Sequence, residues 1–153
     1  MIKILFVCHG NICRSTMAEF VFKYMIEKEG LGSQVYVNSA ATSYEEIGNP
    51  PHYGTVRKLS EVGIPVGEHR AVRIEKGDYE KYDMIIGMDS QNIRNIKNIL
   101  GPDRDNKVSL LLNFTSRGGN IADPWYTGNF DDTYRDVKEG CEGLLEYIKG
   151  LGK

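Results

Sequence analysis

The sequence predicts a doubly wound α/β fold, with a sheet of four parallel strands that is covered by helices on both faces. Short, continuous apolar runs recur along the chain, as expected of strands that are buried on both faces. Longer stretches with apolar residues at helical spacing separate these runs. Strands that alternate with helices form right-handed βαβ units, which place the strands parallel in one sheet.

The first part of the chain supplies two strands and two helices. Residues 2–7 form a continuous apolar, β-branched run, which predicts a buried strand. Residues 16–29 carry apolar side chains at helical spacing, and glycines follow them as stop signals. Residues 35–37 predict a second strand that ends at residues 38–39. Residues 53–62 predict a helix, which a glycine and a proline close.

The middle of the chain continues the alternation. Residues 82–88 contain a third buried strand. Asp89 or Ser90 can cap the helix that follows, which runs to about Leu100 and ends at a Gly-Pro pair. Residues 108–112 predict the fourth strand.

Two long stretches are predicted as loops because glycines, prolines and polar residues interrupt every regular pattern in them. They cover residues 40–51 and 113–129. The last helix runs from about 131 to 148, and its first residues, Asp131 and Asp132, suit the positive end of a helix.

The composition fits one compact domain over residues 1–153 and argues against several classes of protein. The formal net charge of −2 gives no reason to expect a nucleic acid or an anionic membrane as partner. No stretch approaches the ~20 apolar residues of a membrane span. Three cysteines, an odd number in a chain without a secretion signal, predict a cytoplasmic protein rather than a disulfide scaffold. They also lack the four-ligand spacing of a zinc site.

Polar residues follow each of the predicted strands. Cys8, Ser39 and Asp89 come after the first three strands, and Asp123 lies in the loop after the fourth. In open parallel sheets, ligands bind beyond the carboxyl ends of the strands, near the switch in strand order. We therefore expect the functional site at this rim.

The first rim loop joins a buried strand to a helix and reads, over residues 8–15, Cys-His-Gly-Asn-Ile-Cys-Arg-Ser. Backbone N–H groups in such a loop can form an anion nest, to which the helix N-terminus adds positive potential. That potential favours a thiolate at Cys8, and the Arg14 guanidinium can contact two phosphate oxygens. Gly10 permits the unusual dihedrals of a nest, and Ser15 can cap the helix or donate to the sulfur. The alternative is that Cys8 is a small buried hydrophobic residue.

Attack on a phosphate ester also needs a proton for the departing oxygen. A positioned carboxylic acid supplies it and typically accelerates the step ~10² to 10⁴-fold. Asp123 is the best candidate, because the proline after it restrains the backbone and the next two aromatic residues partly desolvate the carboxyl group. From the local sequence, a turn-forming Asp-Pro is an equally good interpretation.

Together, these two motifs resemble the low-molecular-weight protein tyrosine phosphatase family. Residues 8–15 resemble the family's phosphate loop near the N-terminus, and residues 122–126, Ala-Asp-Pro-Trp-Tyr, resemble its general-acid segment. The resemblance covers nearly the whole chain. It implies a flavodoxin-like fold and the hydrolysis of phosphotyrosine in proteins, with inorganic phosphate as product and without a metal or cofactor.

The resemblance also implies roles for individual residues. Cys8 attacks phosphorus and forms a phosphocysteine, while Arg14 and the loop amides stabilise the equatorial oxygens. Asp123 protonates the tyrosyl oxygen and then deprotonates the hydrolytic water. Three residues brace the loop through hydrogen bonds: Asn11, Ser39 and His69. The phosphate-binding residues implied are His9, Gly10, Asn11, Ile12, Cys13, Arg14 and Ser15.

Related activities share this scaffold. Arginine phosphatases of the family have threonine at the position of Ile12 and small residues after the Asp-Pro pair. Here four side chains predict an apolar wall for a phenol ring: Ile12, Tyr44, Trp125 and Tyr126. Arsenate reductases use two further downstream cysteines, whereas Cys141 lies alone in the last helix. The alternatives are a phosphoarginine phosphatase, an arsenate reductase, or a non-catalytic phosphate-binding module.

The two cysteines of the first rim loop suggest redox regulation. A sulfenic acid on Cys8 can be trapped as a disulfide by Cys13, although a packed loop residue is as good an interpretation of Cys13. By analogy, Tyr126 and Tyr134 are candidate phosphorylation sites. The sequence makes no prediction of the oligomeric state.

Overall fold

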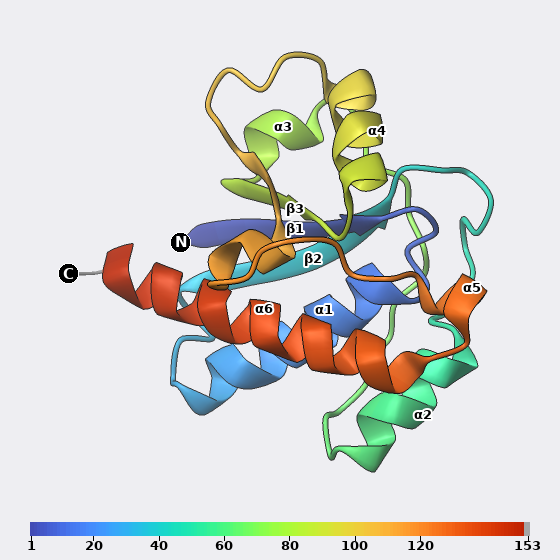
Figure 1. The fold of residues 1–153 in the computed structure, drawn as a ribbon. Coiled ribbons are helices and arrows are strands. Elements are labelled where there is room, and N and C mark those ends of the chain that lie inside the picture. The colour runs from blue at the N-terminus through green and yellow to red at the C-terminus, as the bar shows by residue number, and fades with distance from the viewer. Residues whose placement is uncertain (152–153) are drawn as a thin grey trace.

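The computed structural model describes residues 1–151 and contains a sheet of four parallel strands (Figure 1). The strands are β1 (Ile2–Cys8), β2 (Val35–Ala41), β3 (Met84–Gly87) and β4 (Val108–Leu110), in the order β2-β1-β3-β4. The chain passes from β1 to β2 on one side and then returns to place β3 on the other side. The predicted doubly wound sheet is therefore confirmed, and its switch point lies at the end of β1.

Helices cover both faces of the sheet, as predicted (Figure 1). On one face, α1 (Arg14–Lys28) packs against α6 (Phe130–Leu151), with α2 (Tyr53–Glu61) beside them. The other face carries α3 (Asp78–Lys81) and α4 (Ser90–Leu100). Within residues 1–151, no helix combines the length and the apolar character that crossing a membrane requires.

The continuous apolar run of β1 follows from its position in the sheet. Ile4 and Phe6 belong to the core cluster under α1 and α6, whereas Leu5 and Val7 belong to the cluster under α3 and α4. All of these side chains are at most 2% exposed. Full burial of each such side chain contributes about 1.5–3 kcal/mol to folding. Because both faces of β1 are buried, its apolar residues do not alternate with polar ones. This continuous apolar run is the pattern that predicted the strand.

Three short helical elements were not predicted: α3, η1 (Leu111–Phe114) and α5 (Pro124–Thr127). Each has 4 residues, too few for a helical period to be recognised in the sequence. Because η1 begins at once, β4 ends at Leu110 instead of residue 112. Conversely, β2 continues to Ala41, which forms an isolated bridge with Arg73 in the connector after α2.

Two glycines allow α6 to approach η1 closely. A Cβ added to Gly140 would lie 2.5 Å from Cγ of Leu111, and one added to Gly143 would lie 2.1 Å from the carbonyl oxygen of Phe114. By contrast, a Cβ on Gly150 in the same helix would meet nothing within 4 Å. This contact holds the last helix against the segment that leads from β4 to the predicted acid segment.

We predict that Gly143→Ala destabilises the fold by about 1–3 kcal/mol, because the added methyl group collides with backbone rather than with a movable side chain. Gly150→Ala is the matched control and should be neutral or stabilising by up to about 1 kcal/mol, because alanine has the higher helix propensity. Urea unfolding measures both variants. Equal free energies of unfolding for the two would contradict the close contact.

Candidate active site

The predicted phosphate loop connects β1 to α1 and curls around the sulfur of Cys8. Asn11 adopts a left-handed conformation, with φ of 59°. This turns its backbone N–H toward Cys8, and the N–H donates to Sγ at 3.3 Å. The Ser15 hydroxyl lies 3.0 Å from the same sulfur. Two polar groups therefore lie within hydrogen-bond distance of Sγ, and a cavity of about 90 Å³ opens beside it.

The guanidinium of Arg14 is buried among acceptors. Nη1 donates to Asp89 Oδ2 at 2.6 Å and to the carbonyl oxygen of Ile121 at 3.0 Å. Nη2 donates to Asp123 Oδ2 at 3.4 Å. Burial alone would lower the pKa of Arg14, but the neighbouring sulfur and carboxylates outweigh it and raise the pKa above its ordinary value. Arg14 therefore stays charged.

One donor of Arg14 is left open. Its Nε is buried and has no hydrogen-bond partner within residues 1–151. A buried donor without a partner costs about 1–3 kcal/mol, and more when the group is charged. A buried cation with an unused N–H beside a cysteine is the arrangement expected of an oxyanion site.

Asp89 has two roles, of which the sequence predicted one. Its Oδ1 caps α4 by accepting from the backbone N–H of Asn92 at 2.8 Å, as expected. The other oxygen holds Arg14, which lies 75 positions earlier in the chain. Position at the rim was the only sequence signal for this ion pair, because its partner lies on another element.

Asp123 lies at the start of α5 and at the edge of the cavity beside Cys8. It caps α5, with Oδ1 accepting from the backbone N–H of Trp125 at 3.0 Å. It lines the same cavity as Cys8, and its second oxygen faces Arg14. The turn-forming interpretation and the acid interpretation are therefore compatible, since one oxygen fixes the backbone and the other lies toward the loop.

A buried hydrogen-bond network holds Asn11 in place. Its side-chain oxygen accepts from His69 Nε2 at 2.7 Å and from the backbone N–H of Val72 at 3.2 Å. Its amide nitrogen donates to the hydroxyls of Ser15 at 2.8 Å and Ser39 at 2.9 Å. The structure thus brings together the three residues expected to brace the loop, from the loop itself, β2 and the connector after α2.

The sequence analysis missed a buried carboxylate behind this network. Glu19 of α1 is 2% exposed and accepts hydrogen bonds from Ser39 Oγ and Lys23 Nζ. His69 Nδ1 lies 3.5 Å from it. Burial lowers the pKa of His69, and the charge of Glu19 partly offsets that effect. A charged residue between apolar positions of a helix looks like an ordinary surface residue, so periodicity gave no signal for Glu19.

The mouth of the cavity agrees in part with the predicted apolar wall. Ile12, Trp125 and Tyr126 line the cavity. Tyr44, expected in the same wall, lies elsewhere: its side chain is 70% exposed, and its ring lies 4.2 Å from the Arg73 guanidinium carbon. Arg73 attracts the face of the ring, which turns Tyr44 out of the site. The cavity is lined by Cys8, His9, Gly10, Ile12, Cys13, Glu45, Glu46, Asp123, Trp125 and Tyr126.

Two glutamates line the cavity, whereas Tyr44 does not. Glu45 accepts from the ring of His9 at 2.9 Å, so His9 interacts with the rim rather than the interior. Glu46 accepts from the side-chain amide of Asn49 at 2.6 Å. Within residues 1–151, no group of three or more His, Cys, Asp or Glu side chains is placed to hold a metal ion.

Ser15 does not cap α1, contrary to one of its two predicted roles. The N-cap of α1 is Cys13, which makes no side-chain capping bond. The hydroxyl of Ser15 is used instead by Cys8 and Asn11. The second predicted role of Ser15, a contact with the sulfur, is the one that the geometry supports.

The other two cysteines differ from Cys8 in their environment. Burial, with the nearby charges of Cys8 and Asp123, raises the pKa of Cys13 to about 12. Cys141 is fully buried, which raises its pKa as well. All three are free thiols, so the Cys8–Cys13 disulfide stays a prediction.

Comparison with known proteins identifies the family. A profile of the family described as "Low molecular weight phosphotyrosine protein phosphatase" matches residues 3–152. The chain belongs to this family. Low molecular weight protein-tyrosine-phosphatase YfkJ of Bacillus subtilis (strain 168) is 38% identical over 151 residues, which cover 97% of each chain.

Solved structures agree with this assignment and with the flavodoxin-like fold. The crystal structure of YfkJ from Bacillus subtilis has a TM-score of 0.96 at 37% identity, covering 100% of this chain and 98% of that one. SP-PTP, a low molecular weight protein tyrosine phosphatase from Streptococcus pyogenes, has a TM-score of 0.86 at 40% identity over 97% and 93% of the two chains. DARP, a Drosophila arginine phosphatase, has a TM-score of 0.88 at 29% identity over 97% and 98%.

We predict that iodoacetamide at neutral pH modifies Cys8 and leaves Cys13 and Cys141 unmodified. The thiolate is the nucleophile, and a pKa of about 12 keeps Cys13 protonated although it lines the same cavity. Mass spectrometry of a digest locates the modification, and added inorganic phosphate should slow it. Labelling of Cys13 ahead of Cys8 would contradict this distinction between the thiols.

Proposed function

We propose that this protein hydrolyses phosphotyrosine in proteins through a phosphocysteine on Cys8. The observation that carries the proposal is that the thiol of Cys8 and the carboxyl group of Asp123 line one cavity of about 90 Å³, and that this carboxyl group accepts a hydrogen bond from the buried guanidinium of Arg14, which keeps an unused N–H. Membership of the phosphotyrosine phosphatase family supports the same reaction. Tyrosine-phosphorylated proteins are the proposed substrates, and inorganic phosphate is the product.

In the first step, Sγ of Cys8 attacks phosphorus as the bond between phosphorus and the tyrosyl oxygen breaks. Asp123 donates its proton to that oxygen, so tyrosine leaves as a neutral phenol. Arg14 and the loop N–H groups bind the equatorial oxygens, where charge is spread in the transition state. The open Nε of Arg14 is a donor available for this contact.

In the second step, water attacks the phosphocysteine. Asp123, now a carboxylate, takes the proton from the water, and the bond between sulfur and phosphorus breaks. The Ser15 hydroxyl, 3.0 Å from Sγ, stabilises the departing thiolate. Inorganic phosphate then leaves, and the cavity returns to its starting state.

The cavity wall favours an aryl ester over the alternatives. Ile12, Trp125 and Tyr126 offer apolar surface to a phenol ring, and aromatic contacts add about 0.5–1.5 kcal/mol. An arsenate reductase of this fold needs further reactive thiols, whereas Cys141 is fully buried. A phosphoarginine phosphatase remains the nearest competitor, because DARP has the same fold. In a non-catalytic phosphate-binding module, Asp123 would serve only as the cap of α5 and as a partner of Arg14, and it would have no proton to transfer.

We predict that Asp123→Ala lowers kcat about 10²- to 10⁴-fold on phosphotyrosine peptides, because the phenol then leaves without a proton. The loss should be much smaller on p-nitrophenyl phosphate, whose leaving group is a weaker base. Initial rates on the two substrates measure the difference. Equal losses would remove Asp123 from the acid role.

Cys8→Ser serves as the control for this experiment. It should abolish turnover of both substrates while inorganic phosphate still binds, because the loop N–H groups and Arg14 remain. Persistent turnover in this variant would disprove the nucleophile assignment. A wild type that binds phosphate but turns over neither substrate would instead support the non-catalytic alternative.

We predict that Ile12→Thr shifts the preference from phosphotyrosine toward phosphoarginine peptides. The substitution removes apolar surface from the wall and adds a hydroxyl that can pair with a guanidinium. The ratio of kcat/KM for the two peptides should change at least about tenfold, which corresponds to 1.4 kcal/mol. An unchanged ratio would show that the wall does not select the substrate.

A further inference from the structure

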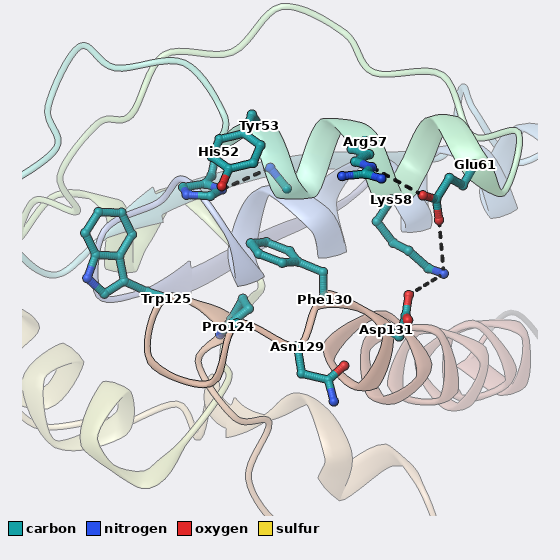
Figure 2. A pocket seen from close by; sticks show the side chains of 12 residues that line it. His52, Tyr53, Arg57, Lys58, Glu61, Pro124, Trp125, Asn129, Phe130 and Asp131 are labelled. Carbon is teal, nitrogen blue, oxygen red and sulfur yellow. Dashed lines mark hydrogen bonds and ion pairs between the residues drawn. The ribbon is translucent and has the colours of Figure 1, made fainter.

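A second cavity adjoins the site and is much larger. This groove, of about 830 Å³, lies between α2 and the segment that joins α5 to α6 (Figure 2). We call it the α2 groove. It is lined by His52, Tyr53, Gly54, Arg57, Lys58, Glu61, Pro124, Trp125, Gly128, Asn129, Phe130 and Asp131.

Trp125 connects the two cavities, because it lines both of them. The cavity beside Cys8 holds about 90 Å³, which leaves no room for more than the phosphorylated end of a side chain. The backbone and neighbouring residues of a protein substrate must therefore lie outside it. The α2 groove begins at the shared indole and is large enough to receive them.

The end of the groove nearest the site is aromatic. The ring of His52 stacks between Tyr53, at 4.5 Å between centroids, and Phe130, at 5.3 Å. Its edge meets Trp125 at 5.7 Å. A Cβ on Gly54 would lie 2.4 Å from Phe130 Cζ, so glycine at this position makes room for the ring. The result is an aromatic surface that runs on from the indole (Figure 2).

Farther from the cavity beside Cys8, the groove contains an exposed arginine, Arg57, whose ion pair with Glu61 is weak. The Arg57 side chain is 78% exposed, and Glu61, one turn along α2, lies 3.6 Å from its Nε. Lys58 differs, because its Nζ lies 2.8 Å from Asp131 and its side chain is 17% exposed. That pairing raises the pKa of Lys58 and lowers the pKa of Asp131. An exposed pair such as Arg57–Glu61 contributes little, so an incoming carboxylate can replace Glu61.

We propose that the α2 groove binds the segment of the substrate protein that flanks phosphotyrosine, and that it selects segments with an acidic residue. An apolar or aromatic side chain of the substrate lies on His52, Tyr53 and Phe130, while the acidic side chain pairs with Arg57. This inference rests on the proposed function, since phosphotyrosine in the cavity beside Cys8 brings the flanking segment to the groove. It makes Arg57 a specificity residue that has no contact with the reacting atoms.

The test compares Arg57→Glu with the wild type on three substrates: p-nitrophenyl phosphate, a phosphotyrosine peptide with glutamates beside the tyrosine, and the same peptide with lysines. For the acidic peptide, kcat/KM should fall about fivefold or more, the size expected when an exposed ion pair becomes a repulsion. For the lysine peptide it should rise, and for the small ester it should change less than twofold. Arg57→Lys should restore most of the activity on the acidic peptide.

Arg104→Glu is the matched control, because it makes the same charge change at an exposed arginine in the loop between α4 and β4. It should leave the ratio between the peptides unchanged. A second variant, Tyr53→Ala, removes part of the aromatic surface and should reduce kcat/KM for a peptide with leucine beside the tyrosine more than for one with serine. Tyr53 is 77% exposed, so the fold does not depend on it.

Binding separates this proposal from the proposed function. In the Cys8→Ser background, fluorescence anisotropy of the labelled acidic phosphopeptide should show weaker binding when Arg57→Glu is added, whether or not the wild type hydrolyses any ester. Equal effects of Arg57→Glu and Arg104→Glu on this peptide would overturn the proposal. The proposal would also be overturned if Arg57→Glu abolished self-association of the protein and left peptide binding unchanged. The groove would then bind a second copy of the chain.

Discussion

The candidate site depends on one buried amide. Asn11 takes the left-handed conformation, and its side chain bonds to Ser15, Ser39, His69 and the backbone after His69. Each such bond contributes about 1 kcal/mol net, which together outweighs the cost of the unusual backbone angle. Because the amide ties the loop to β2 and to the connector, the backbone N–H of Asn11 stays directed at Sγ of Cys8 without the help of a ligand. The pocket is therefore preorganised rather than formed by its ligand.

The electrostatics of the site add a second constraint. Arg14 lies near the sulfur of Cys8 and the carboxyl groups of Asp89 and Asp123. Each of these groups attracts the positive charge of the guanidinium. Asp89 is itself fixed as the cap of α4, so it holds Nη1 in one position. The consequence is a cation that is tethered at one end and still has an unused N–H for an oxyanion.

The sequence predicted much of this arrangement. The features that it did not predict share one physical cause. The apolar run of β1, the helical spacing of α1 and the chemistry of residues 8–15 are local patterns, so they predicted the sheet, the loop and Cys8. The Arg14–Asp89 pair, Glu19 behind the loop and the displacement of Tyr44 by Arg73 depend on contacts between distant segments. Short helices such as α5 were also not predicted, because four residues are too few to show a helical repeat of apolar residues. Local physics predicted which elements form, and tertiary packing decided which side chains meet.

The loop depends on the amide nitrogen of Asn11 as well as on its amide oxygen. Deamidation of asparagine exchanges the NH₂ group for an oxygen of nearly the same size and so removes both hydrogen-bond donors. At Asn11 the new carboxylate would face the hydroxyls of Ser15 and Ser39, with buried Glu19 behind Ser39. Such an aged molecule would keep its sheet and helices, because none of them contains Asn11. Its loop would carry an added negative charge beside Cys8, so exchanging one group at Asn11 would disable the candidate site while the rest of the fold remains.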